Sequence, residues 1–308
     1  MSSYAHRFSK ERRNGMNRKR AQGRFVFFCI APAAILVTLF IFIPTINVFR
    51  MSLYRMGGIT NRKEFVGLSN FQSLFDDKNF LQTMQNSIAI IVLVTLFTIF
   101  FAILFGAILH RGKFKGKNFF RVIFYIPNIL SIVVIAGIFG AIYNPSTGLL
   151  NTFLRAIGLD ALAHQWMGDQ KIVLYSIIFA LVWQAIGYYM VMHVASIDGI
   201  SQEIYEAASI DGATGAQKFF KITIPLLRRS IGTTYILALS GTINLSFTLS
   251  NVMTGGGPNG ASSVLLQYMY TQGMRNANFG YAMAIAMFTL MLAIVLAMIS
   301  RKLSAEKE

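Results

Sequence analysis

The run SIAIIVLVTLFTIFFAILFGAIL, residues 87–109, decides the class of fold to which this chain belongs. It contains no charged residue, and about 20 apolar residues in a helix are enough to cross the roughly 30 Å hydrocarbon core of a bilayer. Backbone groups inside lipid must form their hydrogen bonds within their own segment, so a run of this length forms a helix and not a strand. The run therefore predicts a membrane-spanning helix.

Five further segments meet the same criterion of length and polarity. They are residues 25–49, 122–143, 172–195, 230–250 and 280–299. The sequence therefore predicts an all-α polytopic membrane protein with six transmembrane helices. Its parts are a basic N-terminal tail over 1–24, a six-helix membrane domain over 25–300 and a C-terminal tail over 301–308. The first segment is interpreted as a retained span and not as a signal peptide, because no small-residue cleavage site follows it.

The charge distribution indicates the side of the membrane on which each connection lies. The 28 Lys and Arg against 12 Asp and Glu give a formal net charge of +16, which is also typical of nucleic-acid-binding proteins. Hydrophobic residues make up 55% of the chain, however, and the basic residues lie in short tracts beside apolar runs, so no nucleic-acid partner is expected. The two tails and residues 110–121 and 196–229 hold 20 of the 28 basic residues. Because cytoplasmic loops are enriched in Lys and Arg, both termini of this multi-pass protein are expected in the cytoplasm, with the N-terminal tail against anionic membrane lipid.

The sequence shows no pattern for catalysis or for metal binding. All 12 acidic residues lie outside the predicted spans, no Lys or Arg lies inside one, and only His193 enters. Cys29 is the only cysteine, so neither a cysteine-based metal site nor an internal disulfide can form. No GxxxxGK[ST] phosphate-binding loop is present, so any ATP that drives the protein is hydrolysed by another chain. A secondary transporter or channel that works without ATP is the alternative, although such transporters usually carry ionisable residues at the bilayer midplane.

A patterned loop over about residues 196–229 lies between the fourth and fifth predicted spans. Its central part reads SQEIYEAASIDGATGAQKFFKITIPLL, residues 201–227. Ser201 is a predicted N-cap for a first short helix, Gly212 is suited to end that helix, and Thr214 is suited to cap a second one. Two short helices that meet at a glycine turn make a shape suited to docking another protein. An amphipathic helical hairpin on the membrane surface is the alternative.

Several residues of this loop carry a resemblance to a known family. They are Glu206, Ala207, Ala208, Asp211, Gly212, Ala213 and Pro225. In this order and spacing they resemble the EAA loop of ATP-binding-cassette (ABC) importer permeases, in the version found in carbohydrate importers of the maltose, glycerol-3-phosphate and multiple-sugar type. The run TGGGP at 254–258 resembles another stretch of the same permeases, and the resemblance extends over nearly the whole chain.

The resemblance implies a type I ABC importer permease fold and a role in transport, not catalysis. It implies a heterodimer in which this chain and a second, similar permease form the translocation path for a sugar or oligosaccharide. Two copies of a cytoplasmic ATPase would bind ATP and Mg²⁺, so no cofactor is implied for this chain, and an extracellular solute-binding protein would deliver the sugar. The implied location is the bacterial plasma membrane, and the EAA-like loop is the implied contact with the ATPase.

Polar residues in two predicted spans are candidates for the path of a sugar. They are Gln184, Tyr188 and Tyr189 in the fourth span and Asn244, Ser246, Thr248 and Asn251 in the fifth. Gln184 and Tyr188 are four residues apart and share a helix face, and the same holds for Asn244 and Thr248. Neutral hydrogen-bonding groups and aromatic faces suit a sugar, although such groups also join helices to one another. Pro127 is expected to bend the third span.

Overall fold

The computed structural model describes residues 25–57, 63–111 and 115–304, which fall into two compact units. Unit 1 ends at Met51, and unit 2 begins at Ser52. The basic tail predicted over 1–24 and the end of the C-terminal tail, 305–308, lie outside the described residues.

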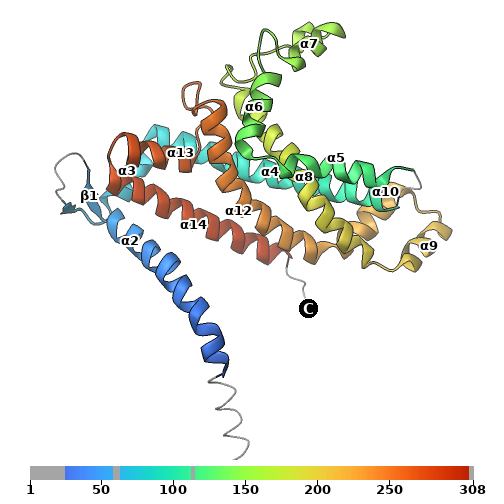
Figure 1. Ribbon diagram of the computed structural model, residues 1–308, viewed down its shortest axis with the longest axis horizontal. Helices are drawn as coiled ribbons and strands as arrows, with labels where there is room; N and C mark the ends of the chain where they lie inside the picture. The colour runs from blue at the N-terminus through green and yellow to red at the C-terminus, as the bar shows by residue number, and fades with distance from the viewer. Residues whose placement is uncertain (1–24, 58–62, 112–114, 305–308) are drawn as a thin grey trace, which may run out of the picture. The chain divides into compact units, whose positions relative to one another are not determined.

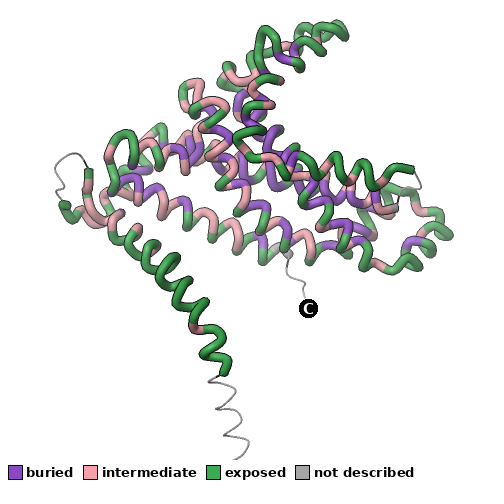
Figure 2. Tube along the Cα trace, in the orientation of Figure 1, coloured by how far each residue is buried: buried purple, intermediate pink, exposed green. Residues whose placement is uncertain are grey.

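Unit 1 is built on one apolar helix. The candidate span Phe25–Ser52 contains a π-helical segment, η1 (Thr38–Phe42), which α2 (Ile43–Ser52) follows directly. Large apolar side chains are exposed along this helix, and none of its most apolar window is buried (Figure 2). A helix that is apolar all round is stable only when lipid or protein surrounds it. Within residues 25–51, the part of unit 1 that the structure describes, the first predicted span is thus a helix with no packing partner.

Four long helices of unit 2 are apolar and long enough to cross a membrane (Figure 1). They are α4 (Lys78–Arg111), α8 (Val173–Asp198), α12 (Arg228–Met253) and α14 (Phe279–Ser304). They contain the predicted second, fourth, fifth and sixth spans almost entirely and extend beyond them. The reason is that apolarity marks only the part of a helix that lies in hydrocarbon, whereas polar residues continue the same helix outside it.

The predicted third span, 122–143, is wrong as a single helix. α5 (Lys117–Ile129) and α6 (Ile132–Ile142) meet at an angle of 103°. Leu130 is extended between them, and the Oγ of Ser131 caps α6 by accepting a backbone N–H at 3.3 Å. By length and composition the described residues therefore contain five candidate spans, or six if this bent pair counts as one.

The bend does not lie at the residue expected to cause it. Pro127 is buried inside α5, and the helix continues for two residues beyond it before it breaks. Pro127 removes one backbone hydrogen bond from α5 but does not end the helix. The break comes at Ser131, whose side chain caps the first turn of α6.

Shorter elements connect the long helices. Toward the N-terminal side of unit 2 they are β1 (Tyr54–Met56), β2 (Lys63–Phe65) and α3 (Ser69–Asp76). In the middle of the chain they are α7 (Leu149–Ala156), η2 (Asp160–Leu162), α9 (Gln202–Ile210), α10 (Gly215–Lys218), η3 (Phe219–Thr223) and α11 (Ile224–Leu226). After α12 come α13 (Leu265–Tyr270) and η4 (Thr271–Arg275). The strands pair antiparallel with Arg55 opposite Glu64. Within unit 2, α9 and α10 lie at one end, and α3 and α13 lie at the opposite end (Figure 1).

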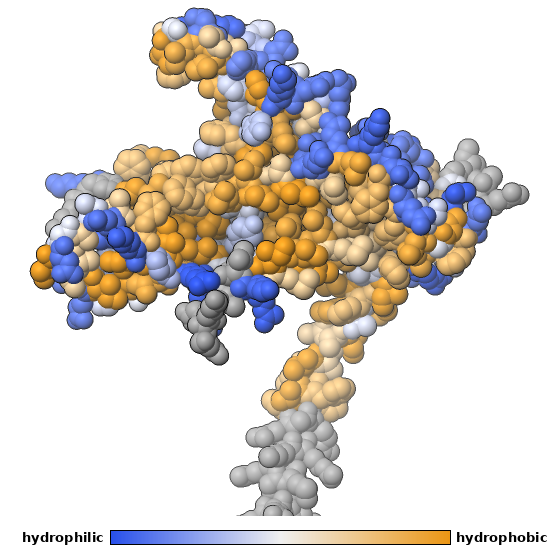
Figure 3. Space-filling view, turned by 180° about the vertical axis from the view of Figure 1, so that it is seen from behind, coloured by the Kyte–Doolittle hydropathy of each residue, from blue (hydrophilic) through white to orange (hydrophobic). Residues whose placement is uncertain are grey.

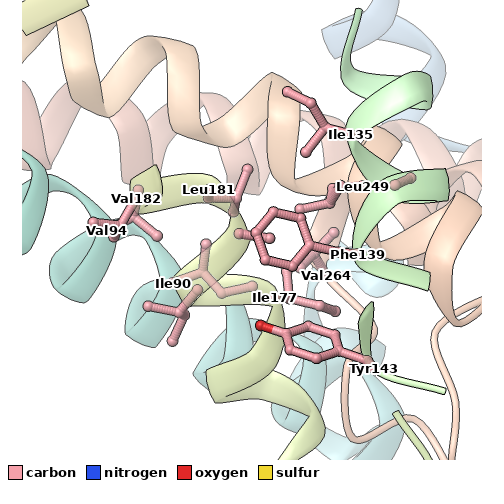
Figure 4. Packing of buried hydrophobic residues seen from close by; sticks show 13 residues of the cluster. Ile90, Val94, Ile135, Phe139, Tyr143, Ile177, Leu181, Val182, Leu249 and Val264 are labelled. Carbon is pink, nitrogen blue, oxygen red and sulfur yellow. The ribbon is translucent and has the colours of Figure 1, made fainter. Parts of the chain in front are cut away.

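Three clusters of buried apolar side chains hold unit 2 together. The first joins α4, α6, α8 and α12 and includes Ile90, Phe139, Ile177 and Leu249 (Figure 4). The second joins α4, α8 and α12 to η3, and the third joins α3, α4, α13 and α14. On the face that Figure 3 shows, hydrophobic residues form a broad band across unit 2, and hydrophilic residues lie at its ends and along its edges. This distribution is expected when lipid and not water is the solvent.

The run TGGGP is a hydrogen-bonded part of the fold and not a free turn. It begins the connection from α12 to α13, and the Oγ of Ser262 in that connection donates to the carbonyl of Gly257 at 2.6 Å. Asn86 of α4 donates its Nδ2 to two carbonyls further along the connection, at 3.0 Å each. Gly256 has a φ of +88°, and a Cβ there would lie 3.0 Å from the side chain of Gln267. The glycine is required both for its backbone conformation and for this close approach.

Asp77 joins three elements at the end of unit 2 where α3 and α13 lie. The hydroxyls of Tyr268 and Tyr281 donate to its Oδ2 at 2.5 and 2.7 Å. Burial by itself raises the pKa of the Asp77 carboxyl, but these hydrogen bonds, with two from backbone N–H groups, outweigh it and hold that pKa below its ordinary value. Burial and the bond to Asp77 in turn raise the pKa of Tyr268 to about 12.

The depressed pKa of Asp77 predicts a pH dependence of stability. The carboxylate stabilises the folded state above its ordinary pKa of 3.8, and this contribution is lost as the pH falls through the lower folded-state value. Asp77→Asn is expected to lower the free energy of unfolding at pH 7 by about 2 kcal/mol, because two hydroxyls lose a charged acceptor. Unfolding temperatures of both proteins, measured from pH 7 to pH 3, check this. The difference between them should shrink below about pH 4; a difference that stays constant would contradict the role of the charge.

Candidate functional site

The predicted docking loop folds as two short helices joined at Gly212. α9 begins after Ser201, whose Oγ accepts a backbone N–H of the first turn at 3.3 Å. It ends in a Schellman motif, in which the Gly212 N–H donates to the carbonyl of Ser209 at 3.1 Å. The N–H of Ala213 donates to the carbonyl of Ala208 at 2.9 Å. Gly212 has a φ of +75°, which a residue without Cβ adopts at little cost. Both predicted ends of α9 are confirmed.

The second half of the loop is a capped helix that widens before a proline. Thr214 and Gln217 form a capping box, in which each side chain accepts the backbone N–H of the other. The helix then passes into the π-helical segment η3, which closes when the N–H of Ile224 donates to the carbonyl of Phe219. Pro225 follows in α11, where its missing N–H interrupts the regular ladder. The predicted cap at Thr214 is confirmed. The spacing of a capping box, with Gln three residues after Thr, is also visible in the sequence.

The structure brings most of the EAA-like residues together on and just after α9. Ala208 and Ala213 are half-buried, and Pro225 is exposed on α11. The exposed residues of the set on and just after α9 are Glu206, Ala207, Asp211 and Gly212. Ile210, an apolar residue beside this set, is 87% exposed. A capped helix that presents apolar, small and acidic side chains to solvent is a surface suited to a protein partner.

Sequence reasoning missed Tyr205, which attaches α9 to the rest of unit 2. Among the residues of α9 it is the one that is buried. Its hydroxyl lies 2.9 Å from the Oγ1 of Thr223, which is itself buried in η3. Its signal in the sequence is that it is the one aromatic residue of α9.

A groove of about 970 Å³ runs between α4 and this loop. Its apolar wall comes mainly from Phe100, Leu104 and Ile108 of α4, and its polar wall includes Glu206 and Lys218. The EAA-like glutamate thus stands at the edge of a groove and not on a flat surface.

A second, smaller cavity of about 280 Å³ lies between the long helices. Three of the candidate path residues, Gln184, Tyr188 and Tyr189, line it, and further polar lining residues are Thr98, Asn128 and Thr242. The Oε1 of Gln184 and the Oγ1 of Thr98 are buried and make no hydrogen bond within the part of the chain that the structure describes. None of the described lining residues carries a charge. The cavity therefore offers unpartnered neutral hydrogen-bonding groups, which a polar uncharged ligand would satisfy.

The four candidate residues of α12 do not line this cavity. Asn244 is exposed and donates to the Ser240 carbonyl at 3.3 Å, while Thr248 and Asn251 are half-buried. Ser246 is buried on another side of the helix, where its Oγ donates to a carbonyl of its own turn. The sequence missed Thr98, Asn128 and Thr242 because they lie on three different segments, and nothing in the sequence shows that these segments meet.

His193 does not join either cavity. It is fully buried in α8, and its Nε2 lies 3.2 Å from the Oγ1 of Thr234 in α12, so it helps to join two helices. Across the described ranges, no group of three or more His, Cys, Asp or Glu side chains comes together as a metal site would require.

Comparisons with known proteins agree with this arrangement. Residues 99–307 match the family model described as "Binding-protein-dependent transport system inner membrane component". The chain is 35% identical to the probable ABC transporter permease protein YurN of Bacillus subtilis over 285 residues, which are 91% of this chain and 96% of that protein. It is 31% identical over 287 residues to the multiple sugar-binding transport system permease protein MsmF of Streptococcus mutans, covering 91% and 95% of the two chains.

The fold is shared with a solved transporter. A bacterial ABC transporter involved in the import of the acidic polysaccharide alginate superposes with a TM-score of 0.79 over 93% of this chain and 97% of that one, at 24% sequence identity. The fold expected from the EAA-like loop is therefore confirmed. The chain belongs to the family of binding-protein-dependent transport system inner membrane components and is a permease subunit of an ABC importer, with the type I importer permease fold.

Proposed function

We propose that this chain forms one half of the translocation path for a sugar or oligosaccharide and is coupled to a separate cytoplasmic ATPase through α9. The observation that carries the proposal is α9 itself, an exposed helix capped at both ends that presents Glu206, Ala207 and Asp211. The other half of the path comes from a second, similar permease, which makes the membrane part a heterodimer.

A sugar is the substrate class that the uncharged cavity supports. Gln184, Thr98, Asn128 and the two tyrosines offer hydrogen bonds and aromatic faces without a charge, which suits a neutral polyhydroxylated ligand and not an ion. The relationship to a permease named for multiple sugars supports the same class. Gln184, Tyr188 and Tyr189 are therefore proposed as path residues, with Asn244, Ser246, Thr248 and Asn251 of α12 outside the cavity lining.

The remaining partners follow from the coupled mechanism. ATP and Mg²⁺ would be bound and hydrolysed by two copies of the ATPase, so this chain acts without a cofactor of its own. An extracellular solute-binding protein would deliver the sugar; the alginate transporter has been solved with such a periplasmic protein. The bias of Lys and Arg toward the tails and the α9 loop supports cytoplasmic termini in a bacterial plasma membrane.

ATP-dependent uptake tests the proposal. The complex of both permeases and the ATPase is reconstituted in vesicles loaded with ATP or with ADP, and the binding protein is added outside. A sugar that raises the unfolding temperature of the binding protein in a screen is then supplied in radiolabelled form. Accumulation with ATP and none with ADP is expected. Equal uptake in both would instead support an ATP-independent transporter or channel.

Thr98→Val separates a ligand contact from a structural role. The Thr98 hydroxyl is buried without a partner among the described residues, so replacing it with a methyl group should leave the unfolding temperature unchanged or higher. Uptake, measured at a sugar concentration well below saturation, should fall about fivefold, because a hydrogen bond to the sugar is worth about 1 kcal/mol. Gln184→Leu should act in the same direction.

Thr289→Val is the matched control. Thr289 is also a buried threonine in a long helix, but its hydroxyl donates to a carbonyl of its own helix and does not line the cavity. Its replacement should leave uptake unchanged. If Thr98→Val and Thr289→Val give the same uptake, the cavity is not part of the path.

A further inference from the structure

Little besides one side chain attaches α9 to the rest of unit 2. The helix makes few contacts with the other described elements, and Tyr205 is the residue that it buries, with an exposed fraction of 4%. A force applied to α9 by a docked partner therefore reaches the body of the protein through Tyr205, or else around the turns at the two ends of the helix. One of those turns contains Gly212, whose φ is positive and whose backbone rotates more freely than that of a residue with a Cβ.

Tyr205 ends on a buried hydroxyl pair. Its hydroxyl lies 2.9 Å from the Oγ1 of Thr223, and either group can be the donor. The same Oγ1 lies 3.3 Å from the carbonyl oxygen of Lys218. Thr223 is 2% exposed, so this bond is shielded from water. A buried bond of this kind fixes one distance between α9 and η3.

The acceptor side of the pair is anchored in the core. Thr223 closes η3, and Phe219 at the start of η3 is buried in the cluster that also holds Leu109 of α4 and Met190 of α8. The same helical run leads through Pro225 into α12, with the Leu227 N–H donating to the Thr223 carbonyl at 3.0 Å. A displacement at Thr223 is thus passed directly to α12, which lines the polar cavity.

We propose that the hydroxyl pair of Tyr205 and Thr223 is the positioning contact through which movement of α9 is transmitted to α12. The inference rests on the proposed docking of an ATPase at α9, and it adds the residues that make the docked helix a rigid lever. Neither residue touches the sugar, and both act by holding α9 at one angle to η3. A second brace, from Lys218 Nζ to Ser209 Oγ at 2.7 Å, is exposed and competes with water.

The test measures the distance between α9 and α12 in the full chain, in lipid nanodiscs, by double electron–electron resonance. Cys29 is changed to Ser, and spin labels are attached at Glu203→Cys on α9 and Leu237→Cys on α12, which are both exposed. One narrow distance distribution is expected. Tyr205→Phe and Thr223→Val should each replace it with a broad one, because each removes the hydrogen bond between the two side chains.

Two further variants make the result specific to the hydroxyl pair. Thr223→Ser keeps the hydroxyl and should keep the narrow distribution, and Ser209→Ala, which removes only the exposed brace, should also keep it. The proposal is overturned if Tyr205→Phe and Thr223→Val both stay narrow. It is also overturned if Thr223→Ser broadens as much as Thr223→Val, because packing and not the hydroxyl would then position α9.

A second arm separates this inference from the docking proposal. In the complete complex with the ATPase, sugar taken up per ATP hydrolysed should fall about fivefold in Tyr205→Phe, as expected for the loss of one buried neutral hydrogen bond. ATPase binding should remain. If the variant transports as efficiently as the wild type, the transmitting role is overturned. If Glu206→Lys still binds the ATPase as the wild type does, docking at α9 is wrong, while the role of the pair in holding α9 still stands on the first arm.

Discussion

Glu206→Lys is expected to abolish binding of the cytoplasmic ATPase while leaving the chain folded. Glu206 is exposed and makes no ion pair among the described residues, so its replacement costs the fold little. On a docking surface, reversing a charge turns an attraction into a repulsion, which lowers affinity by about 2 kcal/mol or more, a factor above ten. Co-purification of the ATPase with the permease pair, and ATP hydrolysis by the product, measure the loss.

Two other variants identify the cause of that loss. Asp160→Lys makes the same charge change at an exposed residue of η2, outside the loop, and should bind the ATPase normally. Gly212→Val leaves the charge alone but places a β-branched residue at a φ of +75°, which should distort the end of α9 and weaken binding as well. If Glu206→Lys binds as well as Asp160→Lys, α9 is not the docking element.

Gly187→Ala should destabilise the protein strongly, although alanine is the better helix former. A Cβ at Gly187 would lie 1.9 Å from the backbone carbonyl oxygen of Phe124, so α5 and α8 touch backbone to backbone at this point. No rotamer change relieves such an overlap, and the two helices must move apart. The overlap is expected to lower the free energy of unfolding by about 3 kcal/mol or more, whereas the better helix propensity of alanine raises it by roughly 1 kcal/mol. The unfolding temperature in detergent should fall by roughly 5–10 °C.

Gly137→Ala provides the opposite case in the same chain. Gly137 is also a helical glycine, in α6, but a Cβ there would meet no atom within 4 Å. Propensity alone should then decide, and the unfolding temperature should stay constant or rise. If both substitutions destabilise the protein equally, the close approach of α5 and α8 is not the reason why position 187 requires glycine.

The sequence predicted best where one segment determines its own structure. The runs 87–109 and 280–299 are helices because lipid leaves an apolar segment no other way to satisfy its backbone. The ends of α9 followed from Ser201 and Gly212 because capping depends on residues a few positions apart. The broken third span shows the limit of such reasoning. Its apolarity is continuous, and hydropathy does not distinguish a straight helix from two that meet at Ser131.

The contacts that define the two functional regions depended on distant parts of the chain. Gln184 and Tyr188 were identifiable as polar residues on one face, but their cavity is completed by Thr98 and Asn128 from other segments. The pairing of these residues follows from how each helix is rotated about its axis. Apolar spans fix that rotation through many small packing contacts, which no periodicity in a single helix reveals.

By itself, the sequence determined that this chain is a multi-pass α-helical membrane protein whose loop over 196–229 carries the EAA-like residues of an importer permease. Both features are local, since they depend on length, polarity and spacing within one segment. Only the tertiary structure decided that Tyr205 meets Thr223, that the buried hydroxyl of Thr98 shares a cavity with Gln184, and that the third span is broken. These depend on side chains from different helices meeting in space, and such meetings are selected by the packing of the whole domain.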